Sequence, residues 1–274
     1  MKNTKVLFIS QEITPYLPES EMANIGRNLP QGIQERGKEI RTFMPRYGLI
    51  NERRNQLHEV IRLSGMNLII DDADHPLIIK VASIQSARMQ VYFIDNEDYF
   101  HRKHVLTDDN GEFFEDNDER AIFFARGVLE TVKKLRWSPD IIHCHGWITS
   151  MVPLYIKKAY DEDPIFANSK VIYSLYDDGF DKTLNKSFKK KVLFDGVDEK
   201  DVAQLEKPDF VNISRFAIDM SDAVIKGSNE INPEINEYLD KINKPVLGFQ
   251  PEEKYIDEYS QFYDKILMDE TNDK

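Results

Sequence analysis

Short apolar segments rich in Val, Ile and Phe alternate along the chain with longer segments whose apolar residues recur at helical spacing. Six of the short segments are predicted strands, namely residues 5–10, 39–44, 140–144, 170–175, 223–226 and 245–249. Residues 121–135 have the apolar spacing of a long helix, which Asn117 or Asp118 is expected to cap. Because strands that alternate with helices form parallel sheets covered on both faces, the pattern predicts an α/β fold.

Other segments break this alternation. Residues 76–94 hold two β-rich runs around a polar break at 85–88, which predicts an antiparallel β-hairpin inserted into the sheet. Residues 252–268 carry aromatic and aliphatic side chains three or four positions apart, so we expect an amphipathic helix whose aromatic face packs on the domain. A helix is also predicted at 230–241, and the polar residues 270–274 are expected to be frayed.

Two segments, residues 101–110 and 176–198, lack a hydrophobic period and are predicted surface loops. The second contains Lys189, Lys190 and Lys191, with acidic residues on both sides. We therefore interpret the lysine run as a solvated part of the surface.

Composition narrows the functional classes. With 41% hydrophobic and 31% charged residues among 274, the chain can build one globular domain with a sizeable core. Its net charge of −12 argues against general attraction to nucleic acid or membrane surfaces, so neither partner is expected. No apolar run has the length of a membrane span, the first residues lack a secretory signal, and the single Cys144 can form no internal disulfide. These features predict a cytoplasmic protein.

Two histidines stand out by position. His143 and His145 lie two residues apart at the carboxyl end of a predicted parallel strand, where open α/β sheets bind ligands. They form either part of a binding site or a hydrogen-bonded pair in a strand-end turn. No metal site is expected, because the chain has neither a Cys/His cluster nor a His-Glu-x-x-His motif. Glycine-rich phosphate loops and a Gly-x-Ser-x-Gly turn are also missing, which disfavours dinucleotide enzymes, nucleoside triphosphatases and hydrolases.

Three ordered blocks carry a more specific signal. They are residues 5–16, KVLFISQEITPY, with residues 40–48, IRTFMPRYG; residues 91–100, VYFIDNEDYF, continuing through Asp116, Asn117 and Arg120; and residues 137–154, WSPDIIHCHGWITSMVPL. Together the blocks resemble the amino-terminal half of bacterial glycogen and starch synthases, whose signature is His-Ala-His-Asp-Trp. Those glycosyltransferases join two Rossmann-like domains across a cleft, the GT-B arrangement.

The resemblance covers most of residues 5–230 and implies one Rossmann-like domain, half of a GT-B enzyme, with the β-hairpin as an insertion. It places this domain at residues 1–228 and a helical carboxyl-terminal extension, packed back on it, at 229–274. Only 46 residues follow Ser228, too few for the family's second domain, which holds the nucleotide sugar. The chain is therefore expected to correspond to the acceptor-side half.

The resemblance also implies the site residues. The catalytic positions correspond to Asp116 and His145, and the substrate-binding positions to Glu12, Tyr47, Asn117 and Trp147. Asp116, His145 and Trp147 are expected to line one concave surface at the carboxyl ends of the strands. Gly146 stands where the family signature has an aspartate.

The family's donor loop, Lys-Thr-Gly-Gly-Leu-Ala-Asp, offers backbone N–H groups and a cation to a diphosphate. The corresponding positions here include Pro18, Glu19, Ser20, Glu21 and Asn24, so the lysine and both glycines are missing. A carboxylate 4 Å from an anion costs about 4 kcal/mol at an effective dielectric constant of 20, which corresponds to roughly a thousandfold in affinity. Glu19 and Glu21 are instead expected to stabilise the start of a helix.

The leading hypothesis is an acceptor-side half that transfers no glucose alone and acts, as a pseudoenzyme, in α-glucan or maltooligosaccharide binding or in regulation. One alternative is a glucosyltransferase subunit that a separate donor-domain protein completes, using adenosine- or uridine-diphosphoglucose for α-1,4-glucosyl transfer. Another alternative is a structural interaction module with an empty cleft. None of these hypotheses requires a cofactor, and the sequence specifies no oligomeric state.

Overall fold

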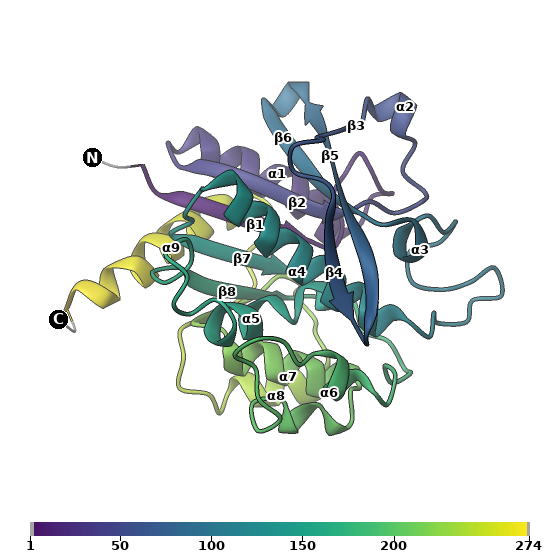
Figure 1. The fold of residues 1–274 in the computed structure, drawn as a ribbon. Coiled ribbons are helices and arrows are strands. Elements are labelled where there is room, and N and C mark those ends of the chain that lie inside the picture. Colours follow the sequence, from purple (N-terminus) through teal and green to yellow (C-terminus); the bar gives the residue numbers. More distant parts are fainter. Residues whose placement is uncertain (1–2, 273–274) are drawn as a thin grey trace.

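The structure, a computed structural model, describes residues 3–272, with side chains described as far as Met268 (Figure 1). Its centre is a ten-stranded sheet in the order β10-β9-β8-β7-β1-β2-β6-β5-β3, and β4 pairs with β5 beside this path. The strands are β1 (Lys5–Ser10), β2 (Glu39–Pro45), β3 (His58–Glu59), β4 (Met66–Ile70), β5 (Ala73–Ile84), β6 (Met89–Asp95), β7 (Ile141–His145), β8 (Lys170–Leu175), β9 (Ala223–Lys226) and β10 (Val246–Leu247).

The predicted parallel sheet is confirmed. Neighbouring strands from β10 to β6 all run parallel, and Leu7 of β1 aligns with Arg41 of β2 on one side and with Ile142 of β7 on the other. Leu7 and Phe8 are both fully buried although they point to opposite faces, because helices cover both sides of the sheet. The continuous apolar runs of the sequence therefore mark strands at the centre of a layered fold.

The hairpin prediction needs one correction. Strands β5 and β6 are antiparallel partners, with Ser83 opposite Gln90, as expected. However, β6 also pairs in parallel with β2, where Thr42 aligns with Val91, so β6 belongs to the wound sheet. The inserted part consists of β3, β4 and β5. The two-residue β3 is too short to stand out in the sequence, whereas β4 is a short apolar run that the sequence analysis missed.

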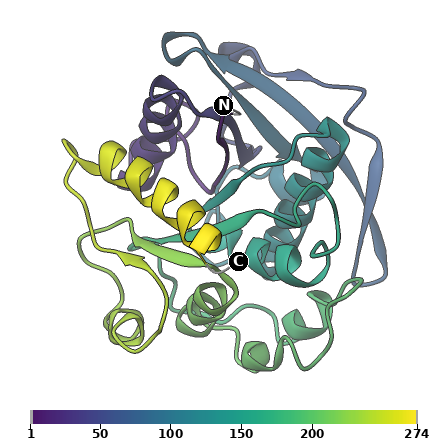
Figure 2. The ribbon, with the colours of Figure 1, turned by 90° about the vertical axis from the view of Figure 1, so that its left-hand side faces the viewer.

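Helices cover both faces of the sheet. They are α1 (Glu21–Glu35), α2 (Glu52–Asn55), α3 (Glu97–Phe100), α4 (Asn117–Leu135), α5 (Val152–Lys158), α6 (Phe188–Lys191), α7 (Phe210–Met220), α8 (Pro233–Leu239) and α9 (Tyr255–Asn272). Helices α1 and α9 lie side by side on one face, and α4, α5 and α7 lie on the other (Figures 1 and 2). Two hydrophobic clusters, one on each face, form the core.

Helix α4 starts earlier than the apolar pattern indicates. Asp116 is its N-cap residue, so the prediction that Asn117 or Asp118 caps the helix is wrong. Asn117 is fully buried inside the first turn, where its side-chain amide donates to the Leu106 carbonyl oxygen (2.9 Å). Asn117 therefore joins the start of α4 to the preceding loop and does not cap the helix.

The carboxyl-terminal segment returns to the domain. The aromatic face predicted for α9 is confirmed, because Tyr259 and Tyr263 are buried against β1 and β7. Strand β10 extends the sheet beside β9, so the segment is more than a helical extension. The division at residue 228 stays a prediction. Residues 270–272, expected to be frayed, continue α9, whereas 273–274 lie outside the described residues.

The lysine run is not a uniformly solvated surface, which corrects the sequence interpretation. The predicted loop 176–198 contains the single-turn α6, and this turn buries Lys191 beside α4. The Lys191 ammonium forms ion pairs with Asp118 (3.0 Å) and Glu119 (2.6 Å). Lys189 and Lys190 remain at the surface, so only one of the three lysines was misplaced.

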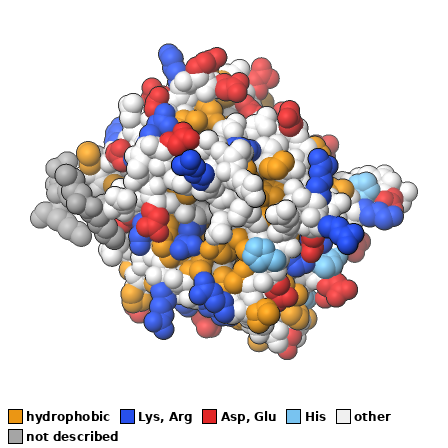
Figure 3. Space-filling view, turned by 90° about the horizontal axis from the view of Figure 1, so that it is seen from above, with side chains coloured by type: hydrophobic (Ala, Val, Ile, Leu, Met, Phe, Trp, Pro, Cys, Tyr) orange, Lys and Arg blue, Asp and Glu red, His pale blue; other side chains and the backbone are white. Residues whose placement is uncertain are grey.

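Acidic and basic side chains are interspersed on the face of the molecule seen in Figure 3. Hydrophobic side chains form small groups between them rather than one broad apolar area. Within residues 3–272, no helix combines the length and hydrophobicity needed to cross a membrane.

Candidate functional site

The carboxyl ends of the parallel strands bring several loops to one edge of the sheet. The loops after β1, β7, β8 and β9 begin at Gln11, Gly146, Tyr176 and Gly227. The backbone N–H of Gln11 donates to the His145 carbonyl oxygen (3.1 Å), and that of Gly227 donates to the Leu175 carbonyl oxygen (2.7 Å), so neighbouring loops are fixed to each other. In open α/β sheets this edge is where ligands bind.

The two signature histidines form a buried polar pair beneath this edge. Their ring centroids are 3.8 Å apart. The ring nitrogens of His143 bond the hydroxyls of Tyr263 (2.6 Å) and Ser174 (2.7 Å), and Nδ1 of His145 bonds the Tyr176 hydroxyl (2.7 Å). Burial lowers the pKa of His143 well below its usual range and that of His145 to about 3, so both rings are neutral at pH 7. This geometry matches the interpretation of a hydrogen-bonded pair.

The position of Gly146 has a conformational explanation. Its φ of +86° is one that only glycine adopts readily, and an added Cβ would lie 2.8 Å from Oε1 of Gln11 and 2.9 Å from Sδ of Met22. A signature aspartate therefore does not fit here without a shift. A carboxylate instead comes from Asp178, whose Oδ2 accepts a hydrogen bond from the backbone N–H of Trp147 (2.9 Å).

Asp178 was missed by the sequence analysis. Burial of its carboxyl raises the pKa of Asp178 to about 7, although the bond from Trp147 opposes that shift. The residue follows β8 in the same way that the histidines end β7. The strand-end rule that selected the histidines could therefore have selected Asp178 as well.

The predicted site residues do not share one open surface. Asp116 is half-buried and forms a two-oxygen ion pair with Arg102. His145 and Trp147 are each 1% exposed, and Tyr47 and Asn117 are fully buried. The structure therefore does not place Asp116, His145 and Trp147 on one concave surface as expected, and the roles that the resemblance implies for these residues stay predictions.

Several buried polar atoms beneath the edge have no hydrogen-bond partner among the described residues. They are the Tyr47 hydroxyl, Nη2 of Arg120, Nε1 of Trp147 and Nε2 of His145. Buried polar groups are nearly always satisfied in folded proteins, so water or ligand groups are expected to complete these. Three of the four belong to residues that the resemblance selects.

Arg120 is the fourth, and the sequence analysis gave it no role. It is fully buried, donates from Nε to the Tyr99 carbonyl oxygen (2.8 Å) and from Nη1 to Oδ1 of Asn117 (2.5 Å), and packs over the Tyr47 ring. Burial lowers its pKa to about 10. Its place in the second block of the resemblance, directly before the apolar stretch of α4, was the available signal.

The accessible part of the edge is aromatic and acidic. Phe113, Phe180 and Phe210, here called the aromatic ridge, pack one against the next with centroid distances of 4.9 and 5.6 Å. Phe113 and Phe180 are half-buried, whereas Phe210 is only 6% exposed. Trp147 lies beneath Phe180, at 4.9 Å between ring centroids. One hollow of about 520 Å³, here called the acidic hollow, is lined by Phe180 and Phe210 together with Asp177, Asp181, Glu230 and Asn232.

A second hollow of about 460 Å³ lies at the other end of the ridge. It is lined by residues 112–115 and 182–186, which include Phe113. Loop 176–198 thus borders both hollows, and sequence reasoning missed it because a loop without a motif gives no sign of the aromatic residues it will meet. Phe180 among acidic residues directly after a strand was the only local signal.

The positions of the family's donor loop form a helix start. Ser20 is the N-cap of α1, and its Oγ accepts from the backbone N–H of Ala23 (3.0 Å) and donates to Oε2 of Glu12 (2.7 Å). Glu21 lies in the first turn and accepts from the Ser228 hydroxyl (2.5 Å). The expected helix start is present, with Glu21 in its first turn, but the capping residue is Ser20, and Glu19 lies before the helix and is exposed. Near this start, an added Cβ at Gly26 would lie 2.5 Å from the Glu12 carbonyl oxygen, so a glycine lets α1 approach the loop.

The chain is similar in sequence and in fold to known proteins. Glycogen synthases of Chlorobium limicola and Chlorobaculum tepidum are each 40% identical to this chain over 176 residues, which is 64% of the chain and 36% of the relative. The chain therefore spans about a third of the length of these relatives. One solved structure, the catalytic domain of starch synthase IV from Arabidopsis thaliana bound to ADP and acarbose, aligns with a TM-score of 0.72 at 19% identity.

That alignment covers 90% of this chain and 51% of the plant protein, which shows that the fold is one half of the plant catalytic domain. The family described as the starch synthase catalytic domain matches residues 5–243, from β1 to beyond α8. The chain thus belongs to the starch synthase catalytic domain family.

Proposed function

We propose that this domain binds α-glucan at the carboxyl edge of its sheet and does not transfer glucose by itself, so that it acts in glucan binding or regulation. The observation that carries the first part is the acidic hollow against the aromatic ridge. Carboxylates accept hydrogen bonds from sugar hydroxyls, and the apolar face of a pyranose ring packs on an aromatic side chain. The plant neighbour, whose fold this chain shares, is bound to acarbose.

The charge of the hollow selects a neutral ligand. Asp177, Asp181 and Glu230 would repel a phosphate or a carboxylate, whereas a glucan chain carries no charge. The unpartnered atoms of Trp147 and His145 lie in the layer below, where water can link them to a bound sugar. The proposal therefore assigns direct contacts to the hollow and a supporting role to the buried signature residues.

We expect maltoheptaose to bind the 274-residue polypeptide in calorimetric titration, and the double variant Asp177→Asn/Asp181→Asn to bind at least tenfold more weakly. Hydrogen bonds to charged acceptors contribute about 1.5–3 kcal/mol each, and about 1.4 kcal/mol corresponds to a factor of ten. Both aspartates are exposed, so the exchange should leave the thermal midpoint unchanged.

Asp240→Asn removes an exposed carboxylate outside the hollow and serves as the matched control. If maltoheptaose releases no heat, or if the double variant binds as tightly as Asp240→Asn, glucan binding at the acidic hollow is excluded. A structural interaction module would then be the better interpretation.

The absence of transfer is inferred from the start of α1. A nucleotide sugar bound as the family's donor loop binds it would meet Glu19 and Glu21 in place of a lysine. The side chains of Ser20 and Glu21 are also hydrogen-bonded to Glu12 and Ser228, so at the helix start they are occupied by protein partners. Asp116 and His145 would then persist as inherited positions that hold the edge together.

Labelled glucose from adenosine- or uridine-diphosphoglucose should therefore not appear in glycogen above background with the purified 274-residue polypeptide. A His145→Ala variant provides the matched blank. Incorporation that depends on the unchanged protein and is lost in this variant would contradict the proposal. Incorporation only after addition of a separately produced donor domain would instead support the hypothesis of a transferase subunit.

A further inference from the structure

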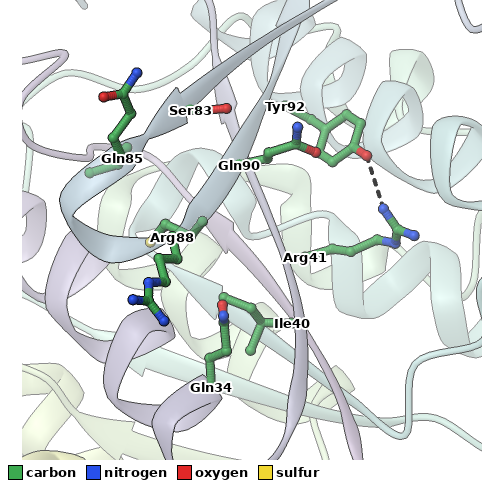
Figure 4. Close-up of a pocket in the computed structure, with 10 residues that line it drawn as sticks. Gln34, Ile40, Arg41, Ser83, Gln85, Arg88, Gln90 and Tyr92 are labelled. Carbon is green, nitrogen blue, oxygen red and sulfur yellow. Dashed lines mark hydrogen bonds between the residues drawn. The ribbon is translucent and has the colours of Figure 1, made fainter.

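A hollow at the opposite edge of the sheet has the chemistry of a different ligand. It measures about 430 Å³ and lies between the tip of the β5–β6 hairpin, the start of β2 and the end of α1 (Figure 4). We call it the amino-edge hollow, because it lies at the amino ends of β2 and β6. The carboxyl edge with its acidic hollow is on the far side of the sheet.

Strand register builds a polar stripe into this hollow. Ser83 of β5 is the antiparallel partner of Gln90 of β6, and the alignment of Thr42 with Val91 sets Arg41 of β2 beside Gln90. Nη1 of Arg41 donates to the Tyr92 hydroxyl (2.9 Å), whereas its Nε is buried without a partner among the described residues. The guanidinium also lies over the Trp137 ring, 5.2 Å from the centroid. Arg41 is therefore held in place while one donor stays unused.

The charge of the amino-edge hollow is the reverse of that at the carboxyl edge. Its lining includes Arg41 and Arg88 and contains no acidic residue. Within residues 3–272 neither arginine forms an ion pair with a carboxylate, although the chain carries a net charge of −12. The nearby Glu39 accepts instead from Nε1 of Trp137 (2.5 Å). Unpaired guanidinium groups in an acidic protein favour an anionic ligand.

The second arginine occupies a special backbone position. Arg88 has a φ of +51° at the hairpin tip, a conformation in which glycine or asparagine costs less. Figure 4 shows that its side chain extends toward Gln34 of α1, whereas Arg41 turns to Tyr92. The two guanidinium groups thus stand at different ends of the hollow, with amide and hydroxyl groups between them.

We propose that the amino-edge hollow binds a phosphorylated sugar, with one phosphate on Arg41, a second on Arg88 and the sugar hydroxyls on Gln90 and Ser83. Guanidinium groups match phosphate oxygens with two parallel donors, and amides both donate to and accept from hydroxyls. Because the two arginines stand at different ends of the hollow, a sugar that carries a phosphate at each end can offer one phosphate to each of them. Such a site lies apart from the glucan-binding edge and is independent of the proposed function.

Calorimetric titration with glucose 1,6-bisphosphate, glucose 6-phosphate, inorganic phosphate and glucose tests this site. We expect the bisphosphate to bind most tightly and glucose not to bind measurably. Arg41→Gln and Arg88→Gly should each weaken bisphosphate binding about tenfold, because each removes one charge-assisted contact. Arg62→Gln removes an exposed guanidinium outside the hollow and should leave the affinity unchanged.

The glycine variant separates ligand binding from stability. Because glycine suits the backbone of residue 88, Arg88→Gly should keep the thermal midpoint while affinity falls. A steep loss of thermal stability would show that Arg88 serves the fold, for example by countering the negative end of α1, and would overturn the proposal. Equal affinity for inorganic phosphate and the bisphosphate, equal losses in Arg62→Gln, or no binding of any probe would also overturn it.

Discussion

Deletion of residues 251–274 is expected to abolish cooperative folding of the domain. Helix α9 is the second helix on its face of the sheet and packs on β1, β7 and α1 (Figure 2). Its loss would expose the apolar side of β1, including Phe8, to water. The measurement is a thermal melt followed by circular dichroism, in which the truncated protein should show no sigmoidal transition.

The size of the expected loss in stability follows from the side chains that α9 buries. Five of them are at most 8% exposed, namely Tyr255, Tyr259, Phe262, Tyr263 and Ile266. At ~1.5–3 kcal/mol for each buried side chain, the helix contributes roughly 8–15 kcal/mol before conformational entropy. Whole domains are stable by about 5–15 kcal/mol, so little stability would remain.

Packing of α9 is close as well as extensive. An added Cβ at Gly32 of α1 would lie 2.5 Å from the side chain of Ile256, so the two helices touch where α1 has no side chain. The ends of the contact are fixed by polar groups, because Lys38 bonds Ser260 and Asp264. This ion pair is open to water on the Asp264 side, which weakens it, so most of the expected loss comes from the apolar face.

Single substitutions keep this prediction testable if the truncated protein cannot be purified. Tyr263→Ala should lower the free energy of unfolding by about 3–5 kcal/mol, because it empties a fully buried site and leaves Nδ1 of His143 without its partner. Met268→Ala, on the same helix but 64% exposed, should change it by less than about 0.5 kcal/mol. Equal effects of the two substitutions, or an unchanged melt of the truncated chain, would show that α9 is dispensable.

The sequence predicted α9 well because its signal is local. Aromatic and aliphatic residues three or four apart specify one buried face wherever the helix packs. The central strands were equally clear, since a strand buried on both faces reads as a continuous apolar run. In contrast, β6 was assigned to a hairpin alone, because its pairing with β2 depends on Thr42 and Val91, which are far apart in the chain.

The candidate site shows the same limit. Lys191 looked solvated among acidic neighbours, but its partners Asp118 and Glu119 come from a helix some 70 positions earlier. From the sequence, Gly146 indicates only that the signature aspartate is replaced. The structure shows that Gly146 has a positive φ and that Asp178 accepts a hydrogen bond from the backbone N–H of Trp147. Most positions that the resemblance identified are buried, whereas the aromatic ridge joins Phe113 and Phe180, from two loops, to Phe210 at the start of α7.

The second large effect is a loss of folding stability when the pH is lowered. His143 and His145 are neutral and buried in the folded protein, with the pKa of His145 lowered to about 3 and that of His143 also well below its usual range. In the unfolded chain both rings have a pKa of ~6.5. Below pH 6.5 the unfolded state therefore binds two protons that the folded state does not. The free energy of unfolding consequently decreases as the pH is lowered.

Asp178 acts in the opposite direction. The pKa of its carboxyl is raised to about 7 in the folded protein, so as pH falls from 7 the folded state takes up a proton that the unfolded chain lacks until about pH 4. That uptake stabilises the fold and offsets about one of the two histidines. The histidine contribution is therefore best measured as a difference between the protein and a variant in which only the histidines are changed.

Chemical unfolding of the unchanged protein and of His143→Gln/His145→Gln at pH 7 and pH 5 isolates this contribution. Each histidine is expected to cost about 2 kcal/mol over this interval, so the unchanged protein should lose roughly 4 kcal/mol more than the double variant. His58→Gln, which changes an exposed ring, is the matched control and should lose as much as the unchanged protein. Imidazole NMR signals of His143 and His145 that titrate between pH 7 and pH 5 in the folded protein would contradict the prediction, because rings that accept protons in both states give no such difference.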